Sequence, residues 1–151
     1  MKCDIICTIR KGMIVMDEKE TDKKAALIEF FKADKFVELA GIKIEEITNE
    51  YAVCTAEITP AHLNANGCVQ GGMLYTLADF TFAVLENYLH ATTVTQCGHI
   101  NYLRPAFTDK LIATARETER AGHTCLCEVR VTDASGKVCC ICNFSGFIKE
   151  K

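Results

Sequence analysis

The feature that most constrains the fold is a helix-length segment, from Gly72 to about His90, that is apolar on nearly all sides until Glu86. A helix of this kind has no polar face to present to water, so other elements must surround it. Before Glu86 it carries one carboxylate, Asp79, which is the only Asp, Glu, Lys or Arg between Glu57 and Glu86. Because burial of an unpaired charge is unfavourable, Asp79 should have a dedicated partner or a chemical function.

The rest of the chain predicts one helix before this segment and strands on both sides of it. Helical spacing of apolar residues indicates a helix over 22–40, with Asp22 as its N-cap and Gly41 as its stop. Alternation of apolar and polar residues predicts two strands before the central helix and four after it. The predicted strands are 42–47, 51–58, 92–104, 110–120, 123–132 and 137–148. The pattern is typical of an α+β domain in which an antiparallel sheet wraps a central helix.

Length, composition and charge exclude several classes of protein. The 151 residues suffice for one domain with a substantial core, and 49% hydrophobic and 25% charged residues are ordinary for a globular protein. A formal charge of −3 without a Lys/Arg cluster indicates no nucleic-acid partner and no anionic membrane, and no apolar run could span a bilayer.

The N-terminal apolar run is too short and too charged for a signal peptide. We therefore expect a cytoplasmic protein. Residues 1–21 are interpreted as an extension, either disordered or strand-like, before a domain over 22–151. A second interpretation is an upstream start, with Met16 opening the domain.

Ten cysteines allow two interpretations. Thiols inside apolar strand patterns, without an export signal, are expected to stay reduced and to pack as small hydrophobic side chains. A four-residue turn at 133–136 would pair Thr132 with Lys137 and would place four thiols on one hairpin face, where they could bind zinc. These are Cys125, Cys127, Cys140 and Cys142, with Cys127 opposite Cys142. No two of these four cysteines form a C-x-x-C pair, and the residues between them are apolar, which favours the hydrophobic interpretation.

The loop before the central helix carries a family pattern. Residues 62–72 read H-L-N-A-N-G-C-V-Q-G-G, L-A-D follows at 77–79, and N-Y-L-R-P-A occupies 101–106. This pattern resembles the signature of PaaI-like acyl-CoA thioesterases of the 4-hydroxybenzoyl-CoA thioesterase superfamily, over about residues 38–148. The resemblance implies the hotdog fold and a homodimer, or a dimer of dimers, with active sites shared between subunits. It also implies hydrolysis of an acyl-CoA, with aryl- or phenylacetyl-CoA as candidates, and no metal or redox cofactor.

Thioester hydrolysis needs an electrophilic donor and a base or nucleophile, and Gly71 and Asp79 could supply them. A free N–H at a helix N-terminus can donate to a developing oxyanion, and glycine lets the acyl group approach closely. The alternative is that Gly71 and Gly72 only permit a tight turn. Asp79 would act as a general base or as a nucleophile, and the alternative is a carboxylate satisfied by Thr76 or Thr81.

The spacing of these two groups predicts a dimer. Eight residues separate Gly71 from Asp79, which corresponds to about 12 Å along a helix. Both groups therefore cannot act on one carbonyl from one chain. In a two-fold dimer with antiparallel helices, each Asp79 would face the partner's Gly71.

The resemblance assigns supporting roles to other residues. Asn64 and Gln70 would position substrate or water, and Thr95 would assist Asp79. Many relatives carry His where this chain has Gln70, so no role at that position can require an imidazole. Asn64 in a loop and Thr95 in a strand also have ordinary structural explanations. The candidate substrate-binding residues are Gly72, His62 and Arg104, the last as a contact for a phosphate of coenzyme A.

Two other functions stay open from the sequence. A hotdog hydratase or dehydratase usually needs a His–Asp or His–Glu pair, which glutamine at position 70 makes less fitting, although His62 could substitute. A non-catalytic acyl-CoA binding module would leave Asp79 unexplained. The remaining histidines, His90, His99 and His123, lack metal-ligand spacing, so the sequence predicts no metal site.

Overall fold

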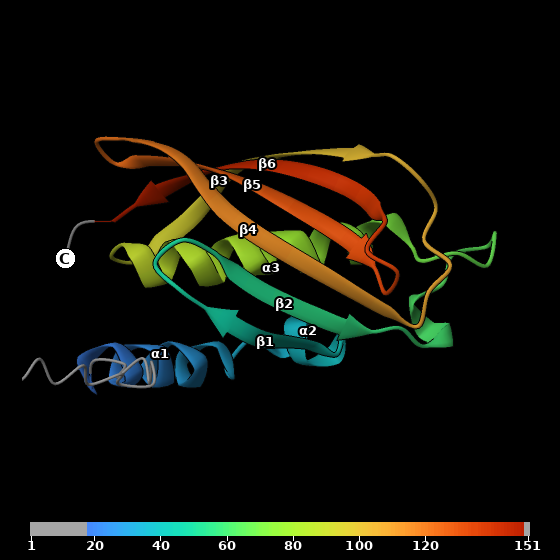
Figure 1. The fold of residues 1–151 in the computed structure, drawn as a ribbon, viewed down its shortest axis with the longest axis horizontal. Coiled ribbons are helices and arrows are strands. Elements are labelled where there is room, and N and C mark those ends of the chain that lie inside the picture. Colours follow the sequence, from blue (N-terminus) through green and yellow to red (C-terminus); the bar gives the residue numbers. More distant parts are fainter. Residues whose placement is uncertain (1–17, 150–151) are drawn as a thin grey trace, which may run out of the picture.

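The computed structural model describes residues 18–149, which form a curved antiparallel sheet around one long helix (Figure 1). The helices are α1 (Glu18–Phe31), α2 (Lys35–Leu39) and α3 (Gly71–Leu89), with a short 3-10 helix at Pro60–His62. The strands are β1 (Ile42–Ile47), β2 (Ala52–Glu57), β3 (Thr93–Tyr102), β4 (Lys110–Ala121), β5 (Thr124–Asp133) and β6 (Val138–Ile148). Their order in the sheet is β1-β2-β4-β5-β6-β3, with every neighbouring pair antiparallel. The predicted hotdog fold is confirmed.

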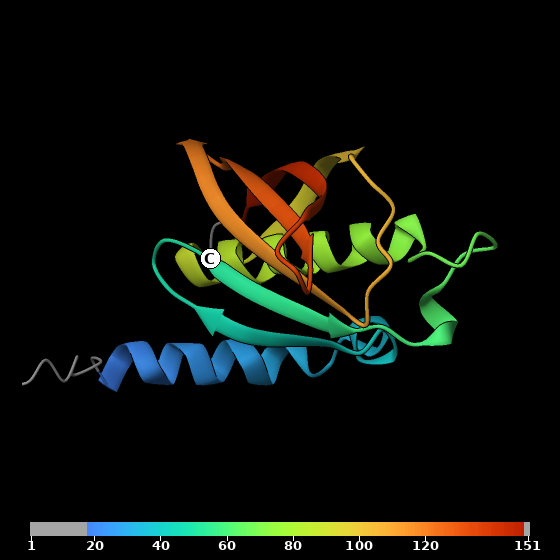
Figure 2. The same ribbon diagram turned by 45° about the vertical axis from the view of Figure 1, so that its right-hand side comes forward.

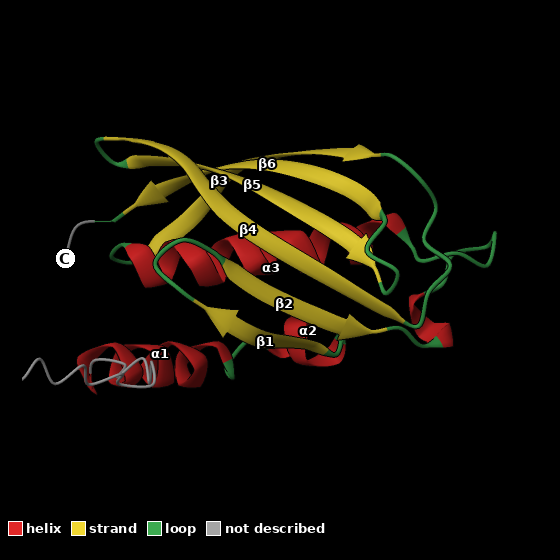
Figure 3. Cartoon of the chain, viewed as in Figure 1, coloured by secondary structure: helices red, strands yellow, loops and turns green. Residues whose placement is uncertain are grey.

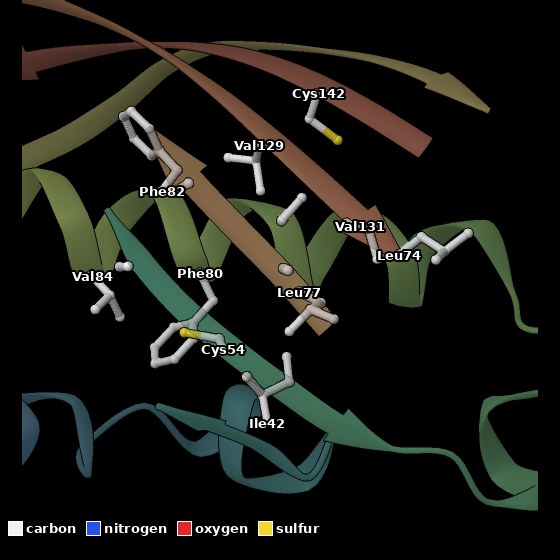
Figure 4. Packing of buried hydrophobic residues seen from close by; sticks show 14 of the residues in the cluster. Ile42, Cys54, Leu74, Leu77, Phe80, Phe82, Val84, Val129, Val131 and Cys142 are labelled. Carbon is white, nitrogen blue, oxygen red and sulfur yellow. The ribbon is translucent and has the colours of Figure 1, made fainter. Parts of the chain in front are cut away.

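The sheet encloses α3, as the composition of this helix requires. Figures 1 and 2 show the β1–β2 hairpin and the β3–β6 pair on different sides of α3. In the core, Leu77 and Phe82 of α3 and Val129 and Val131 of β5 are all fully buried (Figure 4). Burial of such side chains contributes about 1.5–3 kcal/mol each, so the apolar helix and the sheet stabilise one another. None of the helices in the described part of the chain could cross a membrane.

The single helix predicted over 22–40 is wrong. The structure has two helices there (Figure 3): α1 already begins at Glu18, so Asp22 lies inside it and is not its N-cap. Asp34 interrupts the helix, because its Oδ1 accepts hydrogen bonds from the N–H groups of Phe36 and Val37, both at 3.1 Å, and caps α2. Gly41 follows α2 with a φ of 65°, which agrees with the predicted stop.

The N-terminal extension lies almost entirely outside the described residues. Only its last four positions, 18–21, are described, and they belong to α1. The interpretation of residues 1–17, the alternative start at Met16 and the domain limits of 22–151 stay predictions.

The register predicted for the last hairpin is also wrong. Thr132 pairs with Val138 and not with Lys137, and Cys127 pairs with Phe144 and not with Cys142. The register shifts next to the turn, where Asp133 Oδ1 accepts hydrogen bonds from the backbone of two turn residues. At Cys127 the displacement is two residues, which leaves each side chain on its predicted face.

The four cysteines that were predicted to share one face of this hairpin are all buried, which agrees with that prediction. Burial raises the pKa of Cys125 to about 12 and also raises the pKa of Cys127. Protonated thiols among apolar side chains behave as small hydrophobic groups, and zinc needs thiolates. The structure therefore favours the hydrophobic interpretation of these residues; Figure 4 shows Cys54 and Cys142 in the core.

Candidate active site

The loop between β2 and α3 is held by backbone hydrogen bonds that bring its C-terminal end to the helix. The Gln70 N–H donates to the carbonyl oxygen of His62 at 2.8 Å, and the Val69 N–H donates to that of Ala106 at 3.0 Å. The loop therefore spans from the 3-10 helix to the segment after β3, and it places Gly71 at the first position of α3.

Gln70 is the N-cap of α3. Its side-chain oxygen accepts a hydrogen bond from the N–H of Gly72. A Cβ at position 72 would lie 2.7 Å from that oxygen, so Gly72 is required for the close approach of the cap. Neither Gly71 nor Gly72 has a positive φ, so the backbone conformation at these two positions does not by itself require glycine. The sequence did not identify the capping role of Gln70.

The N–H of Gly71 is available for a ligand. Because Gln70 caps Gly72, the neighbouring Gly71 N–H is left without an acceptor among residues 18–149. Tyr102, at the end of β3, donates its hydroxyl to the Gly71 carbonyl at 3.0 Å, and its ring would lie 3.1 Å from a Cβ at position 71. A free N–H at the positive end of a helix is suited to stabilise an oxyanion.

Asp79 has one specific hydrogen-bond donor. The hydroxyl of Thr95, on β3, donates to Asp79 Oδ1 at 2.8 Å, as the resemblance implied. The predicted alternative partner Thr81 instead donates to the carbonyl of Leu77 at 2.6 Å. Partial burial raises the pKa of Asp79, the Thr95 hydrogen bond lowers it, and the negative charge of Asp34 raises it. A carboxylate with a raised pKa is a better proton acceptor than an exposed one.

Removal of the Thr95 hydroxyl should change the pH dependence of catalysis. In Thr95→Val, burial and Asp34 act on the pKa of Asp79 without the opposing hydrogen bond, so this pKa rises further. Catalysis needs the ionised carboxylate, so the acidic limb of the profile of kcat/KM against pH should move to higher pH. At neutral pH we expect a loss of about 10-fold. Thr95→Ser keeps the hydroxyl, so its acidic limb should lie at the wild-type pH. If the pH profile of Thr95→Val matched that of Thr95→Ser, the role of Thr95 would be contradicted.

The structure does not bring Gly71 and Asp79 together within one chain. They lie on the same helix at positions 71 and 79, about 12 Å apart along its axis. An open groove of about 540 Å³ lies at the N-terminus of α3, and Asp79 is not among the residues that line it. Its polar lining comes from Asn64, Gln70, Gly71, Gly72, Tyr102 and Arg104.

The other predicted residues divide between this groove and the loop that supports it. Arg104 lies in the groove, and among residues 18–149 no carboxylate pairs with it. Asn64 also lines the groove, but its oxygen accepts from the Asn66 N–H at 2.8 Å and its nitrogen donates to Cys68 Sγ at 3.1 Å. His62 uses its Nδ1 to accept from the Thr59 N–H at 3.1 Å, which caps the 3-10 helix. The side chains of Asn64 and His62 therefore support the loop directly.

Sequence reasoning missed two residues of the site. Tyr102 belongs to the N-Y-L-R-P-A segment, but only the folded chain shows that it covers Gly71. Asp34 precedes Asp79 by 45 positions, and its charge acts on the pKa of Asp79 because α1 packs on α3, with Phe31 against Phe80. The sequence around Asp34 contains a signal for a helix N-cap, but it contains no signal for proximity to Asp79.

This chain is similar to proteins of known family and of known structure. The model of the family described as Thioesterase superfamily matches residues 66–140. The acyl-coenzyme A thioesterase PaaI of Escherichia coli K12 is 30% identical over 108 residues, which cover 71% of this chain and 77% of that protein. A solved protein of Thermus thermophilus is 30% identical with a TM-score of 0.71, over 76% of this chain and 97% of that chain.

Two further solved structures share the architecture. The Escherichia coli PaaI protein has a TM-score of 0.79 at 24% identity, over 87% of this chain and 95% of that chain. A hypothetical thioesterase of Streptococcus pneumoniae, solved with coenzyme A, has a TM-score of 0.68 at 27% identity, over 73% of this chain and 90% of that chain. The chain belongs to the thioesterase superfamily, and within it to the PaaI-like thioester hydrolases with the hotdog fold.

Proposed function

We propose that this protein hydrolyses an acyl-CoA thioester in active sites shared by the two subunits of a homodimer. The observation that carries the proposal is the pair of groups on α3: a free Gly71 N–H at its N-terminus and a Thr95-bonded carboxylate, Asp79, about 12 Å further along. One chain cannot place both groups at one carbonyl. Antiparallel contact of two such helices would complete two sites at once.

The exposed edge of the sheet supplies a surface for this contact. β3 is an edge strand of ten residues, and its outer side pairs with no strand among residues 18–149. Val94 is 40% exposed and Tyr102 is 53% exposed on this strand. Long exposed edge strands readily pair with another chain. Pairing of β3 with a second copy would place the Asp79–Thr95 pair next to the interface. The dimer, and its further association into a tetramer, stay predictions that light scattering tests.

The groups support a hydrolysis in two steps. Asp79 removes a proton from water while the water oxygen attacks the thioester carbon, and the Gly71 N–H of the partner subunit donates to the resulting oxyanion. When the carbonyl reforms, the C–S bond breaks, and the proton held by Asp79 passes to the departing thiolate. The products are the free acid and coenzyme A. In the alternative role of Asp79 as nucleophile, a mixed anhydride forms first and water then cleaves it. In a single turnover in ¹⁸O-water, the general-base route places ¹⁸O in the released acid. The nucleophilic route places ¹⁸O in Asp79 and leaves the acid unlabelled when water cleaves the anhydride at the Asp79 carboxyl carbon.

The named relatives support an acyl-CoA substrate for this protein. One relative is named an acyl-coenzyme A thioesterase, another was solved with coenzyme A, and the Escherichia coli PaaI protein comes from the phenylacetic acid degradation operon. We therefore propose phenylacetyl-CoA and related aryl-CoA esters as the first substrates to assay. Hydrolysis of this kind needs no resident metal or redox cofactor. A cytoplasmic location stays part of the proposal.

Arg104 is proposed to contact a phosphate of coenzyme A. It lies in the groove beside Gly71 without a carboxylate partner among residues 18–149, and its guanidinium matches a phosphate in charge and shape. Arg104→Ala is expected to raise KM for the acyl-CoA by about 5- to 10-fold and to leave kcat within about 2-fold. The same acyl group on N-acetylcysteamine, which lacks the phosphates, should show no change in KM. An equal rise in KM for both substrates would contradict the assignment.

An assay of thiol release over a panel of acyl-CoA esters tests the reaction itself. The proposal expects release of one thiol per acid formed. Binding of acyl-CoA without thiol release would support a non-catalytic binding module. Addition or removal of water at the acyl chain, detected by mass spectrometry with the thioester intact, would support a hydratase or dehydratase.

A further inference from the structure

A second cluster of polar side chains lies at the opposite end of α3. Glu86 and His90 are one helical turn apart at the C-terminal end of α3, and Glu117 comes from β4. One ligand atom from each residue lies within 4.8 Å of the other two. His90 Nε2 lies 3.4 Å from Glu86 Oε2 and is in close contact with Glu117 Oε2. Two carboxylates and one imidazole nitrogen thus converge on a single point.

Glu86 is the unusual member of this cluster. Its side chain is 0% exposed, and neither of its carboxylate oxygens has a hydrogen-bond partner among the described residues. The thiols of Cys125 and Cys127 on β5 lie near it, and within residues 18–149 His90 is the only basic residue in contact with it, at 3.4 Å. An orphaned carboxylate in the core is strongly unfavourable unless something compensates it. A bound cation would give these two oxygens the partner that the described side chains do not supply.

We propose that Glu86, His90 and Glu117 bind a divalent transition-metal ion. The 3.4 Å between Glu86 Oε2 and His90 Nε2 equals the separation expected for two ligands that each lie about 2.0–2.1 Å from one tetrahedral ion. Glu117 Oε2, which is in close contact with His90 Nε2, would move outward to take the third ligand position. A cation would also be favoured by the negative end of the α3 dipole, because His90 is the C-cap of that helix. Carboxylate and imidazole donors suit Zn²⁺ and Mn²⁺.

Metal binding at His90 requires one rearrangement in the surroundings of the site. Arg120 Nη1 lies 3.3 Å from His90 Nδ1, so it fixes Nδ1 as the acceptor in the metal-free protein. A metal at Nε2 requires the proton on Nδ1, and the exposed Arg120 side chain must then move away. Glu86 lies seven residues beyond Asp79, about 10 Å along the helix, so this cluster is separate from the proposed catalytic groups. The ion would join the end of α3 to β4 and stabilise the fold.

Metal retention by the full-length protein tests the proposal. Protein stripped with a chelator is dialysed against Zn²⁺ or Mn²⁺, desalted, and its metal content measured by mass spectrometry. Mn²⁺ prefers oxygen and nitrogen donors, so it discriminates this cluster from the thiols. We expect one Mn²⁺ per chain in the wild type and a dissociation constant at least about 100-fold higher in Glu86→Gln and Glu117→Gln. Glu119→Gln, which changes an exposed carboxylate on the same strand, should bind like the wild type.

Thermal unfolding supplies a second measurement that does not depend on activity. Saturating Zn²⁺ is expected to raise the Tm of the wild type by about 5–10 °C and to leave that of Glu86→Gln unchanged. Glu86→Gln keeps the size and shape of the side chain, so it should fold. A wild type that retains no metal would overturn the proposal, and so would equal retention by the wild type and Glu86→Gln. Neither result would affect the proposed thioesterase reaction.

Discussion

Asp79→Asn is expected to lower kcat/KM for an acyl-CoA by about 10³-fold or more. The amide keeps the size of the side chain and can still accept a hydrogen bond from Thr95, but it can neither remove a proton from water nor act as a nucleophile. Asp79→Ala should lose as much activity. Steady-state kinetics with the best substrate of the panel measures the effect.

The stability of the Asp79→Asn protein should separate catalysis from folding. The pKa of Asp79 is raised in the folded protein, so the folded state disfavours the charged form. The stability that protonation provides is present below the unfolded pKa and is lost as pH rises through the folded pKa. At neutral pH the Asn variant should therefore unfold at the same Tm as the wild type or higher. Asp22→Asn, an exposed change of the same type on α1, should leave both activity and Tm unchanged. Near wild-type activity in Asp79→Asn would refute the role of this residue.

Gly71→Pro is expected to lower kcat by about 10²- to 10³-fold, because it deletes the proposed oxyanion donor. Proline has no N–H and is favoured at the first position of a helix, which is the position of Gly71. Gln70 has a φ of −66° and a ψ of 136°, the extended conformation that a residue before proline prefers. The substitution should therefore remove one hydrogen-bond donor and leave α3 intact, which circular dichroism would verify.

Gly71→Ala is the matched control for the proline variant. Alanine adds the same Cβ beneath Tyr102, a contact of 3.1 Å with an exposed side chain that can shift, but it keeps the N–H. We expect a loss of less than about 10-fold in kcat. Equal losses in the Ala and Pro variants would show that space beneath Tyr102, and not the N–H, is the essential property of Gly71.

The sequence predicted the parts of the fold that depend on the local periodicity of apolar residues and on clear turn signals. The apolar segment became α3 within one residue at each end, and each predicted strand is present. Where a side chain competes with the backbone, local pattern was insufficient. Asp34 divides a helix whose apolar periodicity continues across it, and Asp133 shifts the register of the β5–β6 hairpin.

The part of the candidate site that lies in or near one segment of the sequence was predictable. Gly71, Asp79 and Thr95 lie in or near the family pattern, and the Asp79–Thr95 hydrogen bond was anticipated. Contacts between distant segments were not, such as Tyr102 over Gly71 and Asp34 near Asp79. The sequence predicted no metal site, and no local signal indicated that Glu117, 27 residues beyond His90, would lie next to it.

The shared active site is the central claim, and complementation between two inactive variants tests it most directly. Asp79→Asn and Gly71→Pro chains are co-expressed in equal amounts. In a mixed dimer with shared sites, one site carries both changes and the other carries neither. Half of the dimers are mixed and each has one intact site of two, so the preparation should recover about one quarter of wild-type activity. A mixture of Asp79→Asn with Asp79→Ala should recover none. If co-expressed Asp79→Asn and Gly71→Pro chains were as inactive as either variant alone, the shared site would be contradicted.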